Sequence, residues 1–266
     1  MLELDKIYNM DCIEGMKQID DDGIDLVITS PPYDSLREYN GYNFNFIKTA
    51  LELYRVIKTG GILVWIIGDS VKDGSETLTS FKHALIFKEI GFNLHDTMIY
   101  EKNAFPFPDK TRYSQVFEYM FILSKGFPKT TNIKQIPTKL SNRIKNKTSC
   151  YRTPNGNTKP MKYETGKGLR NKKNVWCYEV GYMKTTKDKD AYKHPAMFPE
   201  KLVKDHLLSW SNEEDIVLDP FLGSGTSCLT AWKYNRHFIG FEINPEYYDL
   251  SMKRLSKVKN QKRLIN

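Results

Sequence analysis

The run Thr29-Ser30-Pro31-Pro32-Tyr33 directly follows the apolar stretch 24–28 and combines a hydroxyl, two prolines and an aromatic ring. Proline fixes φ and has no N–H, so the carbonyl groups of this run are held out as acceptors. We expect a rigid, flat slot in which a planar ring that carries an amino group stacks on Tyr33. The amino group would donate hydrogen bonds to Ser30 Oγ and to the Pro31 carbonyl. The alternative interpretation is a Pro-Pro turn followed by a core tyrosine.

A second motif lies far downstream, where residues 215–226 predict a buried strand, a glycine turn and the start of a helix. Residues 238–242 predict the next strand, which ends on Glu242. Glycines after a first strand let a ligand approach the backbone, and an acid after the second can accept hydrogen bonds from ribose hydroxyls. Glu242 lies 17 residues beyond Gly225, near the spacing of about 20 in nucleoside-binding βαβ units. No Lys follows Gly225, so the loop suits a nucleoside without a phosphate chain.

Alternating helical and strand patterns surround these motifs. Pro-, Gly- and Asn-rich sequence interrupts the alternation between residues 125 and 175. On either side of this interruption, βαβ alternation predicts one mostly parallel sheet with helices on both faces. The expected strands are 24–29, 62–67, 94–101, 116–123, 215–219 and 237–242, and the expected helices are 13–19, 45–57, 78–90, 199–211, 226–235 and one from Pro245.

The motifs Ser-Pro-Pro-Tyr at 30–33, Asp-Pro-Phe-x-Gly-Ser-Gly-Thr at 219–226 and Gly-x-Glu at 240–242 resemble those of the β-class amino-methyltransferases of DNA. These enzymes use S-adenosylmethionine. Their catalytic motif also precedes the cofactor loop, with the target-recognition region between them, and the resemblance covers nearly the whole chain. It implies an α/β, Rossmann-like methyltransferase fold with a mostly parallel seven-stranded sheet, one antiparallel strand and an inserted target-recognition region.

The charge is unevenly distributed along the chain. Residues 125–190 contain 17 Lys and Arg against 4 Asp and Glu, whereas the other 200 residues hold 23 basic and 28 acidic groups. Such segregation suits a surface that binds a polyanion, and double-stranded DNA is the expected partner. A solvated loop is the alternative, but interleaved aromatic residues disfavour it: Tyr151, Tyr163, Trp176, Tyr178 and Tyr182. We predict a catalytic half at 1–124, a basic target-recognition insertion at 125–190 and a cofactor-binding half at 191–266.

The resemblance also implies roles for individual residues. Asn9-Met10-Asp11-Cys12 matches the family's short element near the adenine of the cofactor, although Asp11 taken alone is more typical of a helix N-cap. The implied catalytic residues are Ser30, Pro31, Pro32 and Tyr33. The implied cofactor contacts are Asp11, Cys12, Asp219, Pro220, Phe221, Gly223, Ser224, Gly225, Thr226, Glu242 and Ile243. The implied DNA contacts are Arg37, Arg143, Arg152, Arg170, Lys172 and Lys173.

Two features favour cytosine as the target base. The element His194-Pro195-Ala196-Met197-Phe198-Pro199 is closer to that of N4-cytosine enzymes than to the form common among N6-adenine enzymes, and Ser30 stands in place of Asp or Asn. We therefore expect methylation of the exocyclic N4 of a flipped-out cytosine. N6-adenine methylation is the alternative. An RNA or protein amino-methyltransferase is a more distant one, because those enzymes usually place the cofactor loop before the slot.

Composition limits the remaining classes. The chain lacks a Pro-Cys nucleophile, which argues against C5-cytosine methylation. Its four cysteines, at 12, 150, 177 and 228, have no Cys-x-x-Cys spacing, so we expect no metal site. The N-terminus predicts no signal peptide, and the longest apolar run, 62–67, is too short to span a bilayer. We expect a cytoplasmic, prokaryotic or phage-encoded enzyme. Family analogy adds a companion restriction endonuclease and a homodimer as expectations.

Overall fold

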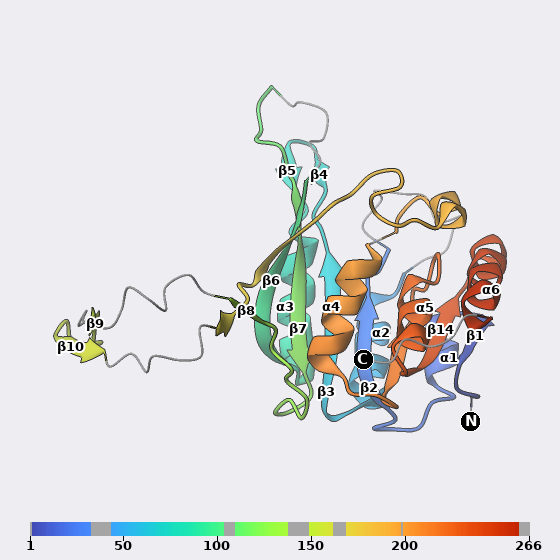
Figure 1. Ribbon diagram of the computed structural model, residues 1–266, viewed down its shortest axis with the longest axis horizontal. Helices are drawn as coiled ribbons and strands as arrows, with labels where there is room; N and C mark the ends of the chain where they lie inside the picture. The colour runs from blue at the N-terminus through green and yellow to red at the C-terminus, as the bar shows by residue number, and fades with distance from the viewer. Residues whose placement is uncertain are drawn as a thin grey trace. The chain divides into compact units, whose positions relative to one another are not determined.

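The computed structural model describes residues 2–32, 44–103, 110–137, 149–161, 169–197 and 199–260. The chain divides into two compact units: Met1–Asn132 with Asn174–Asn266, and Ile133–Lys173. The larger unit contains a sheet whose described strands have the order β1-β14-β13-β2-β3-β7-β6-β12 (Figure 1). These strands are β1 (Lys6–Asn9), β2 (Ile24–Thr29), β3 (Ile57–Ile67), β6 (Asn93–Lys102), β7 (Phe117–Ser124), β12 (Val175–Tyr178), β13 (Ile216–Asp219) and β14 (His237–Glu242).

The predicted mostly parallel α/β fold is confirmed. Within the described sheet, β7 pairs antiparallel with β3 and β6, and every other neighbouring pair is parallel. The expected number of seven strands is wrong, because β12 pairs with β6 and adds an eighth. Trp176 and Tyr178 of β12 are buried against the sheet. Their aromatic rings therefore belong to the core and do not support an exposed nucleic-acid surface.

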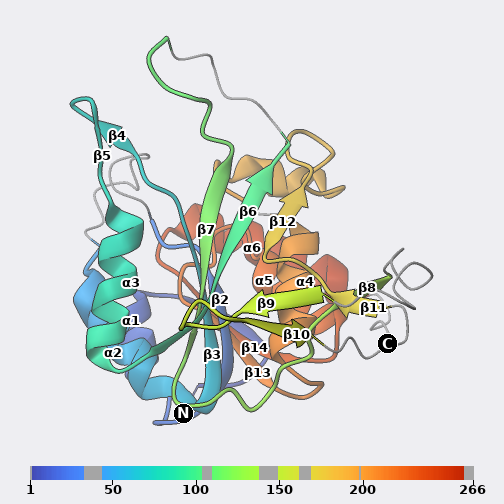
Figure 2. The same cartoon turned by 90° about the vertical axis from the view of Figure 1, so that its left-hand side faces the viewer.

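Helices cover both faces of the sheet, as Figure 2 shows. The helices α1 (Cys12–Met16), α2 (Phe46–Val56) and α3 (Thr79–Ile90) pack on one face, and α4 (Glu200–Trp210), α5 (Thr226–Lys233) and α6 (Pro245–Lys259) pack on the other. Side chains of β3 alternate between these two cores: Ile62 and Val64 face α4 and α5, whereas Leu63 and Trp65 face α2 and α3. Burial on both faces explains the continuous apolar runs of the central strands.

The described residues of the smaller unit form two antiparallel strand pairs. The strands β8 (Gln135–Pro137) and β11 (Leu169–Asn171) form one, and β9 (Ser149–Arg152) and β10 (Thr158–Met161) form the other. This unit spans fewer residues than the predicted insertion at 125–190, because residues 125–132 and 174–190 belong to the larger unit. The larger unit also contains the short hairpin of β4 (Val71–Lys72) and β5 (Ser75–Glu76), and the 3-10 helix η2 (Lys189–Lys193).

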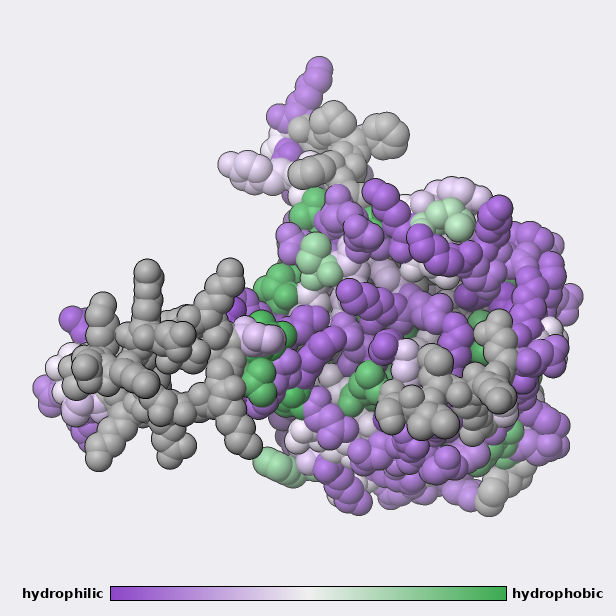
Figure 3. All heavy atoms as spheres, viewed as in Figure 1, coloured by the Kyte–Doolittle hydropathy of each residue, from purple (hydrophilic) through white to green (hydrophobic). Residues whose placement is uncertain are grey.

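The described part of the face shown in Figure 3 is largely polar. Hydrophilic side chains cover most of the face in Figure 3, and apolar side chains occur there in small groups. Among the described residues, no helix combines the length and the apolar character that crossing a bilayer requires.

Candidate active site

The site lies where the strand order of the sheet reverses. From β2 the chain passes through α2 to β3, and from β13 it passes through α5 to β14 on the opposite side. Ligands of open parallel sheets bind at the carboxyl ends of strands at such a point. A cavity of about 1010 Å³ lies there, lined by Ser30 after β2 and by Pro220 after β13. The fold thus brings the two sequence motifs to one cavity.

A buried hydrogen bond ties the two strand ends together. Thr29 Oγ1 donates to Asp219 Oδ1 at 2.7 Å, although 190 positions separate the two residues. Asp219 is 1% exposed and also accepts from the Phe221 N–H, at 3.1 Å, and from the Ser227 hydroxyl. Burial raises the pKa of Asp219 to about 6, and these hydrogen bonds oppose the shift. Asp219 therefore lies behind the cavity wall and holds its two halves in register.

The glycine turn after β13 is built for close approach. Gly223 has a φ of +53°, and a Cβ at this position would lie 2.8 Å from His194 Nε2. Gly225 has a φ of +85° and is the N-cap of α5. Residues 222–224 and Thr226 line the cavity, and the hydroxyls of Ser224 and Thr226 lie 3.2 Å apart. The turn thus presents backbone and two hydroxyl groups to a ligand.

Glu242 ends β14 beside this turn. Its Oε2 accepts from the Gly223 N–H at 2.7 Å and its Oε1 accepts from the Asn244 N–H at 2.9 Å. Burial raises the pKa of Glu242, and these two hydrogen bonds oppose the shift. Each carboxylate oxygen keeps a further lone pair. Since Glu242 lines the cavity, it can accept a hydrogen bond from a ligand hydroxyl.

The chain after β1 forms another part of the wall. Asp11 lines the cavity and is also the N-cap of α1, accepting from the N–H groups of Ile13 at 2.9 Å and Glu14 at 3.3 Å. Both interpretations of Asp11 are therefore compatible with its position. Cys12 lines the cavity as well, and burial raises the pKa of its thiol to about 12. The Cys12 thiol is thus protonated at neutral pH. Ile243 also lines the cavity.

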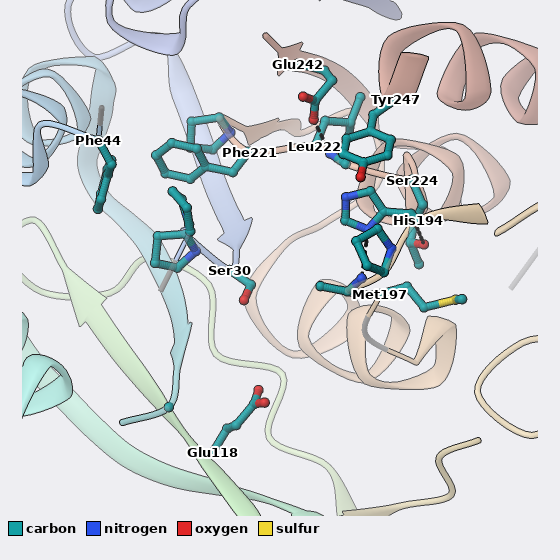
Figure 4. Close-up of a pocket in the computed structure, with 18 of the residues that line it drawn as sticks. Ser30, Phe44, Glu118, His194, Met197, Phe221, Leu222, Ser224, Glu242 and Tyr247 are labelled. Atoms are coloured by element: carbon teal, nitrogen blue, oxygen red, sulfur yellow. Dashed lines mark hydrogen bonds between the residues drawn. The ribbon is translucent and has the colours of Figure 1, made fainter. Parts of the chain in front are cut away.

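Figure 4 shows Ser30 at the end of β2, with Phe221 and Phe44 to one side and Ser224 and His194 across the cavity. The rings of Phe44 and Phe221 meet edge to face, 5.2 Å between centroids. Pro31 and Pro32 line the cavity too. Three predicted site residues lie outside the described part of the chain: Tyr33, Arg37 and Arg143.

Other residues at the cavity were missed by sequence reasoning. His194 is 7% exposed and packs edge-on against Tyr247 at 4.4 Å between ring centroids. Glu118 of β7 points into the cavity from the side opposite Phe221 and pairs with Lys102 (Figure 4). Only the match of residues 194–199 to a family element could have indicated His194. Glu118 and Tyr247 carry no such sequence signal.

The predicted basic residues within the described part belong to the smaller unit. Arg152 lies on β9 and Arg170 on β11, and both are exposed. Lys172 and Lys173 follow β11, where the Lys172 N–H donates to the Lys134 carbonyl at 2.8 Å. Among the residues that the structure describes, no group of three or more His, Cys, Asp and Glu could hold a metal ion.

A DNA methylase family model, that of the N6/N4 methylases, matches residues 24–253. The chain is 54% identical over 241 residues to the orphan methyltransferase M.BamHII of Bacillus amyloliquefaciens, covering 90% of this chain and 91% of that relative. The chain therefore belongs to the N6/N4 DNA methylase family. It is a DNA methyltransferase, and the family uses S-adenosylmethionine.

Solved structures share the fold. The PvuII DNA methyltransferase, described as cytosine-N4-specific, aligns with a TM-score of 0.68 at 19% identity and covers 96% of this chain and 91% of its own. A putative DNA modification methylase from Thermus thermophilus, complexed with S-adenosyl-L-methionine, aligns with a TM-score of 0.63 at 21% identity and covers 97% and 98%. At these identities the likeness establishes the architecture alone.

Proposed function

We propose that this protein transfers a methyl group from S-adenosylmethionine to the exocyclic N4 of a cytosine flipped out of double-stranded DNA. The observation that carries the proposal is the shared cavity: residues 30–32 and the glycine turn line it from the ends of two neighbouring strands. Removing a base from the duplex costs a few kcal/mol. Stacking on Tyr33, proposed from the sequence, would offset part of that cost.

The polar residues that line the cavity fit the proposed cofactor. Glu242 would accept from the ribose hydroxyls, Asp11 and Cys12 would lie beside the adenine, and Ser224 and Thr226 would contact the methionine part. The cavity volume of about 1010 Å³ leaves room for a nucleoside and a base together. When bound, S-adenosylmethionine supplies an electrophilic methyl group on a positively charged sulfur.

The chemistry of the acceptor depends on Ser30 and Pro31. The lone pair of an exocyclic amine is delocalised into the ring, which makes the amine a poor nucleophile. Acceptors at Ser30 Oγ and at the Pro31 carbonyl would favour pyramidal geometry at this nitrogen and stabilise its developing positive charge. The N–C bond would form as the S–C bond breaks and leaves its electron pair on sulfur, and the methylated nitrogen would then lose a proton to solvent. Alignment of the reacting atoms in the cavity supplies several kcal/mol more.

Cytosine is favoured over adenine by Ser30 and by the form of residues 194–197. N6-adenine methylation is the alternative within the same family. Mass spectrometry of nucleosides from a methylated duplex separates the two products. We expect 4-methylcytosine; 6-methyladenine would overturn the choice of base and leave the class of enzyme intact, whereas neither product would contradict the proposal as a whole.

Recognition of DNA is assigned to the basic segment. The exposed side chains of Arg152, Arg170 and Lys173 and the half-buried Lys172 would contact phosphates, together with Arg37 and Arg143. A homodimer, a companion restriction endonuclease and a cytoplasmic location in a prokaryote or a phage-infected cell are further parts of this proposal.

A further inference from the structure

Arg254 of α6 is a buried cation directly behind the glycine turn. The residue is 2% exposed. Its Nη1 donates to the Ser224 carbonyl and lies 3.4 Å from Thr226 Oγ1, and its Nε donates to Asp188 Oδ2 at 2.6 Å. A buried guanidinium is costly unless it is paired and hydrogen-bonded. Here Asp188 supplies the countercharge, and the other contacts go to two residues that line the cavity.

Residues 188–194, which include Asp188, pack against α6 and the glycine turn at 223–225. Asp188 Oδ1 accepts from the Asp190 N–H at 3.1 Å and caps η2, and Asp190 pairs with Lys253 at 3.2 Å and with Lys257 on α6. The same stretch continues to His194, whose ring occupies the space beside Gly223. The glycine turn is thus clamped between α6 and residues 188–194.

We propose that Arg254, oriented by Asp188, is a positioning residue for the amino-acid end of the methyl donor. The inference rests on the proposed function, because it takes the glycine turn as the site of the methionine part. Arg254 fixes the peptide of Ser224 and the hydroxyl of Thr226, and places a positive charge behind the two residues that would contact the methionine part. Its planar fork reaches all three partners, which a lysine ammonium on a flexible stem does not.

Two ligands that differ at this end test the inference. S-Adenosylhomocysteine carries the amino-acid group, whereas 5′-methylthioadenosine lacks it and keeps the nucleoside. In Arg254→Lys and in Asp188→Asn we expect the affinity for S-adenosylhomocysteine to fall about tenfold, because a hydrogen bond to a charged group is lost. The affinity for 5′-methylthioadenosine should stay within about threefold of the native value. Isothermal titration calorimetry measures both.

Lys259→Ala is the matched control, since Lys259 is an exposed cation at the end of α6 whose ammonium donates to the Asp5 carbonyl at 2.9 Å, and it should bind both ligands as the native protein does. An equal loss for both ligands would mean general damage to the fold and would overturn the inference, as would unchanged binding of S-adenosylhomocysteine. Asp188→Asn keeps the test valid if Arg254→Lys does not fold, because Asp188 is 31% exposed. Failure of the native protein to bind S-adenosylhomocysteine would contradict the proposed function itself.

Discussion

Ser30 has the most direct part in the proposed chemistry, since its hydroxyl lines the cavity at the end of β2. We expect Ser30→Ala to lower the rate of methyl transfer by about 100-fold or more, because one preorganised acceptor for the developing charge is lost. Affinity for S-adenosylhomocysteine should stay within about threefold, because Ser30 is assigned to the base and not to the cofactor. Single-turnover transfer of a radiolabelled methyl group, together with calorimetry, measures both quantities.

Ser256→Ala is the control for this substitution, because Ser256 is an exposed serine of α6 whose hydroxyl contacts only the Lys253 carbonyl in the described structure. Its transfer rate should equal that of the native protein. A Ser30→Ala enzyme with native turnover would show that the slot is not where the amine is activated.

Gly223 allows a second test, at the cofactor side of the cavity. A methyl group in Gly223→Ala would meet the His194 ring at 2.8 Å on a backbone with positive φ, so we expect the turn to shift. Binding of S-adenosylhomocysteine should weaken by at least about tenfold. Gly74→Ala is matched, with a φ of +77° and nothing within 4 Å of an added Cβ, and it should bind normally. Equal binding by all three proteins would argue against a cofactor at this turn.

The packing of α2 and α3 on β3 predicts a pH dependence of stability. His83 of α3 is 8% exposed, stacks on Phe46 at 3.5 Å between ring centroids and accepts from Trp65 Nε1 at 3.3 Å. Burial lowers the pKa of His83 from 6.5 to about 4. The unfolded chain therefore binds a proton more readily between these values, so stability from this group is present above pH 6.5 and is lost as the pH falls toward 4.

His83→Phe removes this titration and keeps a stacked ring. Between about pH 7.5 and about pH 4.5, the native protein should lose about 2 kcal/mol more unfolding free energy than the variant. Asp219, whose pKa is raised, has the opposite effect on the pH dependence of stability. Because Asp219 is present in both proteins, its effect cancels when their unfolding free energies are compared. Urea unfolding at both pH values measures it. Parallel losses in the two proteins would mean that His83 does not titrate in this range.

Sequence patterns identified the central strands because each is buried on both faces and reads as a continuous apolar run. They missed β1, which has four residues with a single buried side chain and pairs with β14 at the edge of the described sheet. They also missed β12, whose alternating buried Trp176 and Tyr178 lie in sequence that otherwise has no periodicity. Edge strands of this length depend on their neighbours, so local patterns carry little information about them.

The candidate site, like the fold, was predicted from the sequence only in part. Motifs identify the residues that follow each strand, and most of those predicted from them line the cavity. The motifs do not identify the direction of each side chain. Asp219 lies behind the cavity wall and accepts a hydrogen bond from Thr29, and this contact depends on the pairing of β13 with β2. Contributions from remote elements, such as Glu118 of β7 and Arg254 of α6, require the tertiary structure.

The molecule as a whole separates its charge between regions, and this predicts a salt dependence. Lys172 and Lys173 lie in the smaller unit within the basic segment. Replacing both with Gln should weaken DNA binding and reduce the slope of log K against log salt by about 2, because two fewer counterions are released. Titration of a labelled duplex at several salt concentrations measures the slope. The control, Lys6→Gln with Lys17→Gln on the larger unit, should leave the slope unchanged. If the slope is also unaltered when Lys172 and Lys173 are replaced, these two residues do not belong to the DNA interface.

The central claim is that one cavity holds the methyl donor and the target amine in line. A crystal structure of the protein with S-adenosylhomocysteine and its DNA tests this most directly. We predict that the homocysteine part contacts Ser224 and Thr226, that the ribose contacts Glu242, and that the sulfur faces an extruded base at Ser30. A ligand bound elsewhere, or a sulfur directed away from Ser30, would contradict the account.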